Sequence, residues 1–157
     1  MRTGLLKFAF AAGPAKVSMH QSSIKIIGFS FDINAGNHDR DIHLYEKKNH
    51  FATFDTVHFI KKPDRSSIGL IASLCEGKIA KDQTILDFGD MFNDELLIEE
   101  SYIFTNAHLI SFRKEMREGG DILEHFSMGF SSIQMIFHEN NVKGQSENTI
   151  DYTYTNI

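Results

Sequence analysis

The residues best suited to chemistry in this 157-residue chain are its eight histidines. Potential metal ligands stand close together in one polar stretch: His38, Asp39, Asp41 and His43, with His50 and His58 further on. Neutral imidazoles and carboxylates are good ligands for divalent metals. Their spacing, however, does not place two histidines one helical turn apart, and a flexible loop does not pre-organise its ligands. We therefore expect no metal and no cofactor. A His-dependent metal-binding enzyme stays as the least favoured of the functions considered for this chain.

Patterns typical of nucleophilic or acid–base catalysis are also missing from the sequence. The stretch that starts at Gly129 reads Gly-Phe-Ser-Ser-Ile inside a predicted strand, which is not the Gly-x-Ser-x-Gly turn of a serine nucleophile. Glu99 and Glu100 are neighbours on a predicted strand, so their carboxylates point to opposite faces and cannot share a proton. Gly119-Gly120 lacks the lysine and the helix of a phosphate-binding loop. The sequence predicts no catalytic residue and no enzyme.

The elements that hold these residues are mainly strands, since apolar and polar residues alternate along most of the chain. The predicted strands cover residues 5–10, 24–33, 53–61, 84–90, 96–112 and 123–138, with a short edge strand at 149–154. In the strand 123–138 the apolar residues change phase, from even positions up to 130 to odd positions from 133. A one-residue bulge near Ser131-Ser132, or a strand that crosses between two sheets, would explain the change.

One helix is predicted, over residues 65–76. The turn at residues 63–66 offers a capping oxygen, and Gly77 suits the position just beyond the C-terminus. An apolar stripe at helical spacing follows from four residues: Ile68, Ile71, Ala72 and Cys75. We expect Cys75, the single cysteine, to be a small core residue on that stripe.

A single domain covering residues 1–157 is expected from the length. Many strands with one helix predict a mainly β fold, either a β-sandwich or a β-barrel, with the helix packed outside. Residues 35–50 are mostly polar and predict an extended loop. The sequence favours equally a loop with a functional role and a loop that is only solvated. On strand 96–112, Ile103 and Leu109 lie on an otherwise polar face. That face is expected to meet either solvent or another subunit.

Composition excludes several classes of partner. The formal net charge is −5 and basic residues form no long run, so we expect no nucleic-acid binding. No apolar stretch approaches the ~18 residues of a membrane span, so no membrane insertion is expected. Lys7 interrupts the apolar start of the chain, which does not fit a cleaved signal peptide. We expect the newly made protein to be located in the cytoplasm.

Three segments occur in an informative order. They are IIGFSF (26–31), FIKKPDRSSIGLIASLCEGK (59–78) and the closing strands 102–110 and 125–137, HFSMGFSSIQMIF, around Gly119-Gly120. In the central segment a strand ending in Phe-x-Lys-Lys leads through an Asp and a Ser-Ser pair into a helix that closes with Gly-Lys. Across roughly residues 24–139, this order and spacing resemble the haemolysin-coregulated protein (Hcp) family of type VI secretion systems.

The resemblance implies a structural role and a β-barrel of two sheets with one flanking helix, a fold similar to phage tail tube proteins. Members assemble with copies of themselves into hexameric rings that stack into the inner tube. Their further partners are tube, spike and sheath components and effectors. It also implies a protein that is cytoplasmic in the producing bacterium and is then secreted through the apparatus without a signal peptide. By position, residues 35–50 match the loop that projects from the ring, and the expected interface residues are Asn37, His38, Asp39, Arg40, Asp41, Ile42, His43, Leu44 and Tyr45.

The chain departs from the family pattern in three places. The segment Ala11 to Met19 is short where members usually carry an acidic, Gly-containing loop, Phe31 stands where many members have Trp, and the end after Asn141 is short and polar. A second reading therefore stays open: a secreted Hcp-like effector, or a phage-tail-tube-related protein, that does not form the standard tube.

Overall fold

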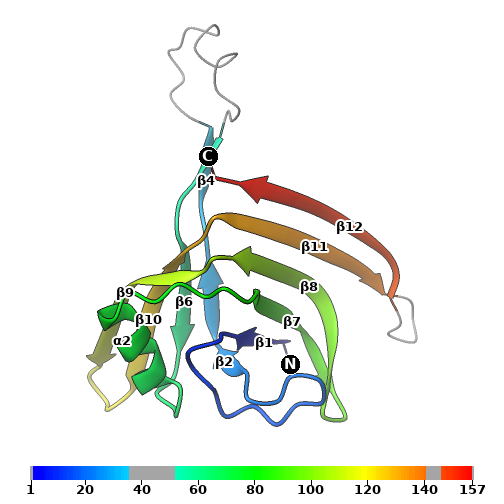
Figure 1. Cartoon of the computed structure of the whole chain (residues 1–157). Helices are drawn as coiled ribbons and strands as arrows, with labels where there is room; N and C mark the ends of the chain where they lie inside the picture. Colours follow the sequence, from blue (N-terminus) through cyan, green and yellow to red (C-terminus); the bar gives the residue numbers. More distant parts are fainter. Residues whose placement is uncertain (1, 36–51, 141–145, 157) are drawn as a thin grey trace, which may run out of the picture.

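The computed structural model of the chain describes residues 2–35, 52–140 and 146–156. Two packed antiparallel sheets form the body (Figure 1). The larger sheet contains, in spatial order, β12 (Ser146–Thr155), β11 (Ser132–Asn140), β8 (Glu95–Thr105), β7 (Thr84–Phe92), β1 (Arg2–Lys7) and β2 (Ile24–Ile26). The smaller sheet contains β3 (Gly28–Ser30), β6 (Val57–Lys61), β10 (Ile122–Gly129) and β9 (His108–Met116). A separate pair is formed by β4 (Ile33–Ala35) and β5 (Ala52–Phe54), and the helix is α2 (Ser67–Cys75).

The predicted mainly β class with one helix is confirmed, but the predicted closed barrel is wrong for the described strands. Strands β12 and β2 are the edges of the larger sheet, and β3 and β9 are the edges of the smaller one. The sheets are joined at their corners by chain segments that turn from one sheet into the other, which couples them without closing a ring of hydrogen bonds.

The phase change in the predicted strand 123–138 marks one of these corners. β10 ends at Gly129 in the smaller sheet and β11 begins at Ser132 in the larger one. Phe126 and Ile133 both reach the core, since the inward phase changes where the chain changes sheet. Of the two explanations that the sequence left open, a bulge or a crossing between two sheets, the structure shows the crossing.

Two other predicted strands are also divided at corners. The stretch 24–33 breaks at Ile27, which is 56% exposed and donates its N–H to the Ile60 carbonyl between β2 and β3. The stretch 96–112 breaks at Asn106, whose φ is 53°. Leu109 therefore lies in the other sheet and is buried in the core, so the expected exposure of this residue on a polar face is wrong.

The main core lies between the inner faces of the two sheets and is largely aromatic. Phe59 and Phe126 stack at 4.9 Å between ring centroids, with 17° between the ring planes, and Phe104 packs edge-on to Phe59 at 6.4 Å. All three rings are almost completely buried. Aromatic side chains bury large areas, which explains how a core forms without tryptophan.

The helix α2 begins and ends close to the predicted bounds, but it buries a different face. Ser67, Leu70 and Ser73 are its buried residues, whereas Ile68 is 74% exposed. Cys75 is exposed, so its predicted place in the core is wrong. The helix is held by polar contacts to the sheet as well as by apolar packing, and a stripe of apolar residues does not reveal such contacts.

The polar contact is a buried ion pair. Lys61 Nζ donates to Glu124 Oε1 at 2.6 Å, and both side chains are fully buried. The Ser67 hydroxyl donates to the same carboxylate oxygen at 2.7 Å, and Lys61 also reaches Asp64 Oδ1 at 3.1 Å. This network ties the start of α2 to β6 and β10.

Within the ranges that the structure describes, no helix is long and apolar enough to span a membrane.

Candidate functional site

The predicted interface residues, Asn37 to Tyr45, lie outside the described residues, as do His38, His43 and His50. The structure does place the two ends of that segment. β4 and β5 pair antiparallel, with Ala35 opposite Ala52, so the segment between them leaves and returns at one point of the body.

A different surface emerges from the register of the larger sheet. One row of paired residues crosses all six strands on the face that holds the core: Ile26, Gly4, Phe88, Glu100, Phe137 and Ile150. Exposure increases along this row toward β12, from 7% at Ile26 to 49% at Phe137 and 61% at Ile150. The core face of the larger sheet is thus left uncovered toward the edge strand β12.

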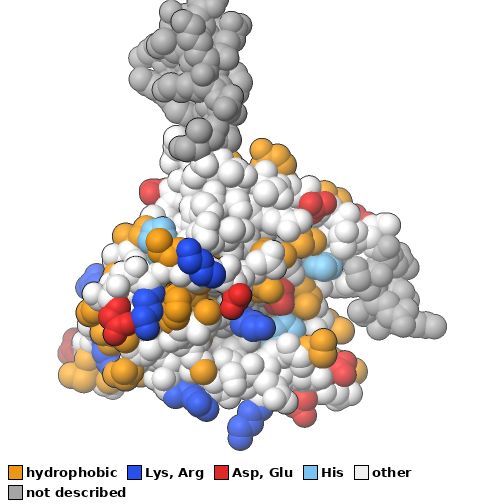
Figure 2. All heavy atoms as spheres, in the orientation of Figure 1, with side chains coloured by type: hydrophobic (Ala, Val, Ile, Leu, Met, Phe, Trp, Pro, Cys, Tyr) orange, Lys and Arg blue, Asp and Glu red, His pale blue; other side chains and the backbone are white. Residues whose placement is uncertain are grey.

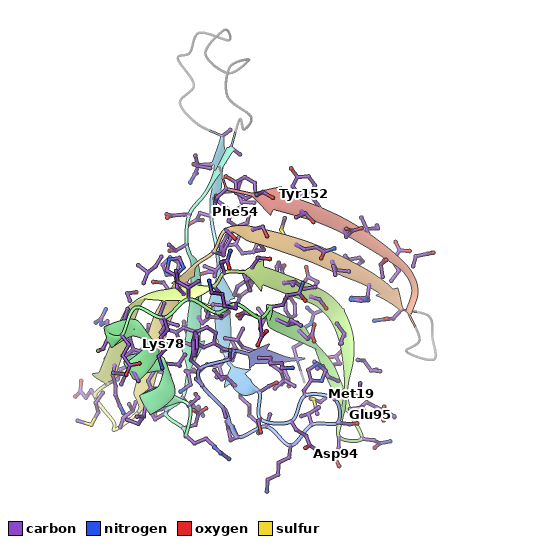
Figure 3. All side chains as sticks on the ribbon, viewed as in Figure 1. Met19, Phe54, Lys78, Asp94, Glu95 and Tyr152 are labelled. Atoms are coloured by element: carbon purple, nitrogen blue, oxygen red, sulfur yellow. The ribbon has the colours of Figure 1, made fainter. Side chains whose placement is uncertain are left out.

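We define the β11–β12 patch as Met135, Phe137, Ile150 and Tyr152. Phe137 pairs with Ile150 and Met135 pairs with Tyr152, so all four side chains share one face. Met135 packs against the main core, while Tyr152 is 63% exposed; Figure 3 labels Tyr152 on β12. The patch is therefore an exposed continuation of the core, next to a strand whose outer edge has no neighbour in the described sheets.

The sequence contained a signal for this patch. Ile150, Tyr152 and Tyr154 alternate with polar residues, and this predicts an edge strand, which β12 confirms. The alternation predicts one apolar face on β12, but not that this face lacks a covering layer. That depends on how far the smaller sheet extends, which only the three-dimensional arrangement gives.

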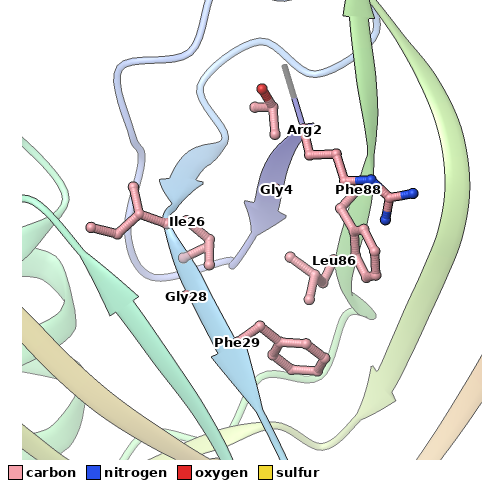
Figure 4. Close-up of a pocket in the computed structure, with 9 residues that line it drawn as sticks. Arg2, Gly4, Ile26, Gly28, Phe29, Leu86 and Phe88 are labelled. Carbon is pink, nitrogen blue, oxygen red and sulfur yellow. The ribbon is translucent and has the colours of Figure 1, made fainter.

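The inner end of the same face is also open. A cavity of about 240 Å³ lies between β1, β2, β3 and β7, with Leu86, Phe88 and Phe29 on its walls and Arg2 at its rim (Figure 4). Phe88 stacks on Tyr102 at 5.9 Å. Burial, followed by the Glu100 carboxylate, raises the pKa of Tyr102 to about 12. The phenol therefore stays neutral over the physiological range and acts as part of an apolar wall.

The described residues supply little for catalysis. Among them, no group of three or more His, Cys, Asp or Glu could hold a metal ion. The Ser101 hydroxyl donates to Asp87, so that proton is not offered to His138, which lies 3.3 Å away. Glu99 pairs with Arg2 at 2.7 Å, whereas Glu100 accepts from the Tyr102 hydroxyl, so the two neighbouring carboxylates have separate partners.

Charge is dispersed over the surface. In the view of Figure 2, acidic, basic and apolar side chains are interspersed over the body. One carboxylate, Glu115, collects three cationic or imidazole partners: Arg113, Arg117 and His125. The hydrogen bond from His125 and the two guanidinium groups lower the pKa of Glu115 below its usual value. Since this side chain lies on an open surface, we assign it no stabilising energy.

The comparison with protein families gives one match, to the family model described as "Type VI secretion system effector, Hcp", over residues 5–137. No curated protein matches the chain.

Solved structures share the fold at low sequence identity. A structure described as a type six secretion system protein aligns with a TM-score of 0.81 at 14% identity, covering 99% of this chain and 96% of that one. Hcp1 from Salmonella typhimurium aligns with a TM-score of 0.77 at 18% identity, covering 98% and 94%. A type VI secretion system effector from Yersinia pestis gives 0.73 at 14% identity, covering 97% and 98%.

The family match covers most of the chain, and the two-sheet architecture with its single helix agrees with it. This chain therefore belongs to the Hcp family of type VI secretion system proteins.

Proposed function

We propose that this chain is a structural subunit of the type VI secretion inner tube, which assembles with copies of itself into stacked rings, six subunits to a ring, and is exported with or carrying effectors. The observation that carries the proposal is the family match over residues 5–137. In this proposal the protein acts through its shape and its assembly, and no catalytic residue is required. The subunit is made in the cytoplasm, and its further partners are tube, spike and sheath components of the apparatus.

The β11–β12 patch supports assembly on physical grounds. An apolar face that continues the core is costly to leave in water, and an unpaired edge strand invites contact with another chain. Burying an Ile or Phe side chain contributes about 1.5–3 kcal/mol. A heterologous contact of this kind, repeated around a closed rotation, generates a ring. We therefore assign the patch to the contact between neighbours within a ring.

The segment between Ala35 and Ala52 supports a second contact. Its ends meet at the β4–β5 pair, which projects from the body in Figure 1. We propose that Asn37 to Tyr45 contact the next ring in the stack, or the neighbouring subunit, as the family resemblance implies.

The ring contact is tested by replacing an apolar side chain of the patch with a charged one. Ile150→Glu places a charge where we expect a buried apolar contact, so ring formation should fall by roughly tenfold to a hundredfold in apparent affinity, the equivalent of about 1.4–2.8 kcal/mol. Phe137→Glu should act in the same direction. Negative-stain electron microscopy and native mass spectrometry of purified protein measure the ring fraction over a concentration series.

Ile68→Glu is the matched control, because Ile68 is a similarly exposed isoleucine on the outside of α2. That variant should form rings like the parent chain. If Ile150→Glu and Ile68→Glu assemble equally well, the patch is not the ring contact. A parent chain that stays monomeric at all concentrations contradicts the tube role itself and favours the reading as an Hcp-like effector outside the standard tube.

A further inference from the structure

The segment between β1 and β2 forms a second layer on the larger sheet. Leu5 points away from the main core and packs with Ala15, Val17 and Leu96 in a separate small cluster. Leu6, the next residue, points into the main core. Since neighbours on a strand point to opposite faces, residues 13–23 cover the face of the larger sheet opposite the core. Figure 3 shows Met19 beside the turn that carries Asp94 and Glu95.

His20 fastens this segment to the sheet through both of its ring nitrogens. Nε2 lies 2.9 Å from Asp87 Oδ2 on β7, and Nδ1 lies 3.2 Å from the Ser18 carbonyl oxygen. Both partners are acceptors, so each contact needs an N–H on the ring. A neutral imidazole carries one N–H, and only the imidazolium carries two. The cationic form of His20 is therefore the one that satisfies both contacts.

The surroundings of His20 favour that arrangement. The side chains of His20 and Asp87 are only 12% and 14% exposed, so solvent replaces their contact poorly. Asp87 Oδ1 accepts from the Ser101 hydroxyl on β8, and this hydroxyl is also 3.3 Å from His138 Nε2 on β11. Lys7 on β1 lines the same small cavity as His20 and Asp87. The groups facing His20 are thus one carboxylate in direct contact, one ammonium, and a second imidazole that acts through Ser101.

The backbone on both sides of His20 is held in an unfavourable conformation. Met19 and Ser22 have φ values of 68° and 63°, a region that costs non-glycine residues free energy. Such conformations persist only where contacts over-determine them. The contacts of this segment include five backbone hydrogen bonds within residues 13–23 and the small apolar cluster. The bonds that tie it to the strands of the larger sheet and their turn are the backbone bond of Ser18 to Asp94 and the side-chain bond of His20 to Asp87.

We propose that His20 is a pH-sensitive latch that holds residues 13–23 against the larger sheet when its imidazole is protonated and loosens them when the proton is lost. In the neutral ring, a lone pair of one nitrogen faces an acceptor oxygen, so one of the two contacts is lost. Histidine changes its charge between about pH 5 and 8. The latch therefore weakens as the pH rises and the second N–H of the ring is lost. Loosening exposes the apolar surface of Leu5 and Leu96, which the segment otherwise covers.

The latch is tested by hydrogen exchange on the full chain, read by NMR as protection factors, which correct for the intrinsic pH dependence of exchange. The reporters are the amides of Ser18, Ser22 and Ser23, all hydrogen-bonded within the segment or to its neighbours. Between pH 5.5 and 8 their protection should fall by roughly tenfold, the effect of losing one bond that involves a charged group. Amides of β6 and β10 should not change over the same range.

His20→Gln should abolish this pH dependence and leave the three amides poorly protected at both pH values. The matched control is His125→Gln, since His125 also contacts a carboxylate, Glu115, at 3.1 Å but lies on β10 in the other sheet. This control should keep the pH dependence of the parent. Segment protection that does not vary with pH in the parent, or that varies equally in His20→Gln, overturns the latch.

A second readout needs no variant. The ¹⁵N shifts of the His20 ring should show both nitrogens protonated at pH 5.5 in the folded chain. A ring with an unprotonated nitrogen at that pH contradicts the latch, whatever the behaviour of the variants. None of these measurements depends on ring or tube formation.

Discussion

At the scale of single residues, the most demanding feature is a lysine and a glutamate inside an apolar core. Removing charges from water is costly, and Lys61 and Glu124 tolerate it because each has several partners. Burial raises the pKa of Glu124, but the hydrogen bonds from Lys61 and Ser67 outweigh burial and hold that pKa below its usual value of 4.5. The pair fixes where α2 begins relative to β10.

Removing the Glu124 charge should destabilise the fold. Glu124→Gln leaves the buried Lys61 ammonium with Asp64 as its remaining anionic partner at 3.1 Å. Unfolding by denaturant at pH 7 should therefore become easier by about 3 kcal/mol, the lower end of the range for a broken buried pair. Glu76→Gln is the control, because Glu76 pairs with Lys78 at 2.9 Å on the open surface, where such a pair contributes about 0–1 kcal/mol. Equal stability of the two variants would contradict the structural role of the buried pair.

The Glu124 carboxyl also predicts how the stability of the fold changes at acidic pH. Its folded-state pKa lies below the unfolded value, so its contribution is complete above about pH 4.5 and is lost as the pH falls through the lower folded-state pKa. The stability of the parent chain should therefore decline more steeply below pH 4.5 than that of Glu124→Gln.

At the scale of the elements, the sequence was informative where alternation was continuous, and it was misleading at Ile27 and Asn106, where predicted single strands change sheet. The phase change around Ser131 was visible because both halves carry large apolar residues; it left a bulge and a crossing between sheets open, and the structure shows the crossing. No comparable signal marked Ile27, since an isoleucine at a corner fits a strand pattern as well as one in the core. The helix was found, but its buried face was not, because Ser67 and Ser73 are polar and the partner of Lys61 is 63 residues away in the chain.

The segment between β4 and β5 leads to an element-scale prediction. Replacing residues 38–50 by a short Gly/Ser linker should weaken ring stacking, since the proposed contact residues are lost, while the body keeps its circular dichroism spectrum. The ends of the segment are already joined by the Ala35–Ala52 pair, so a linker can bridge them. Tube length in electron micrographs measures stacking.

A length-matched Gly/Ser replacement is the control for spacing alone. Loss of the folded spectrum on truncation would contradict the assignment of this segment as a projecting loop. Unchanged stacking would contradict its assignment as an interface.

At the scale of the whole molecule, two sheets are joined into one unit by the chain itself. The antiparallel pair of β8 and β11 in the larger sheet continues into the β9–β10 pair of the smaller sheet through the corners at Asn106 and Ser131. The main core is shared by both sheets. The single domain stays an expectation from the length, and the described strands do not close into the predicted barrel.

Such coupling predicts cooperative unfolding of the body. In a denaturant titration of the Ile150→Glu variant, at a concentration where native mass spectrometry finds monomer, far-UV circular dichroism and tyrosine absorbance should give coincident transitions, because neither sheet retains a complete core without the other. Separate midpoints for the two probes would show that the sheets unfold independently. Tyrosine is the appropriate probe, since the chain has four tyrosines and no tryptophan.

The corner at Gly129 to Ser132 has a mechanical consequence. A force on one sheet is transmitted to the other through the covalent backbone and the hydrogen bonds of the strand pairs that flank the corner. The two sheets therefore cannot slide past each other along their apolar interface. A subunit built in this way resists shear between its two sheets, a property suited to the tube role proposed above.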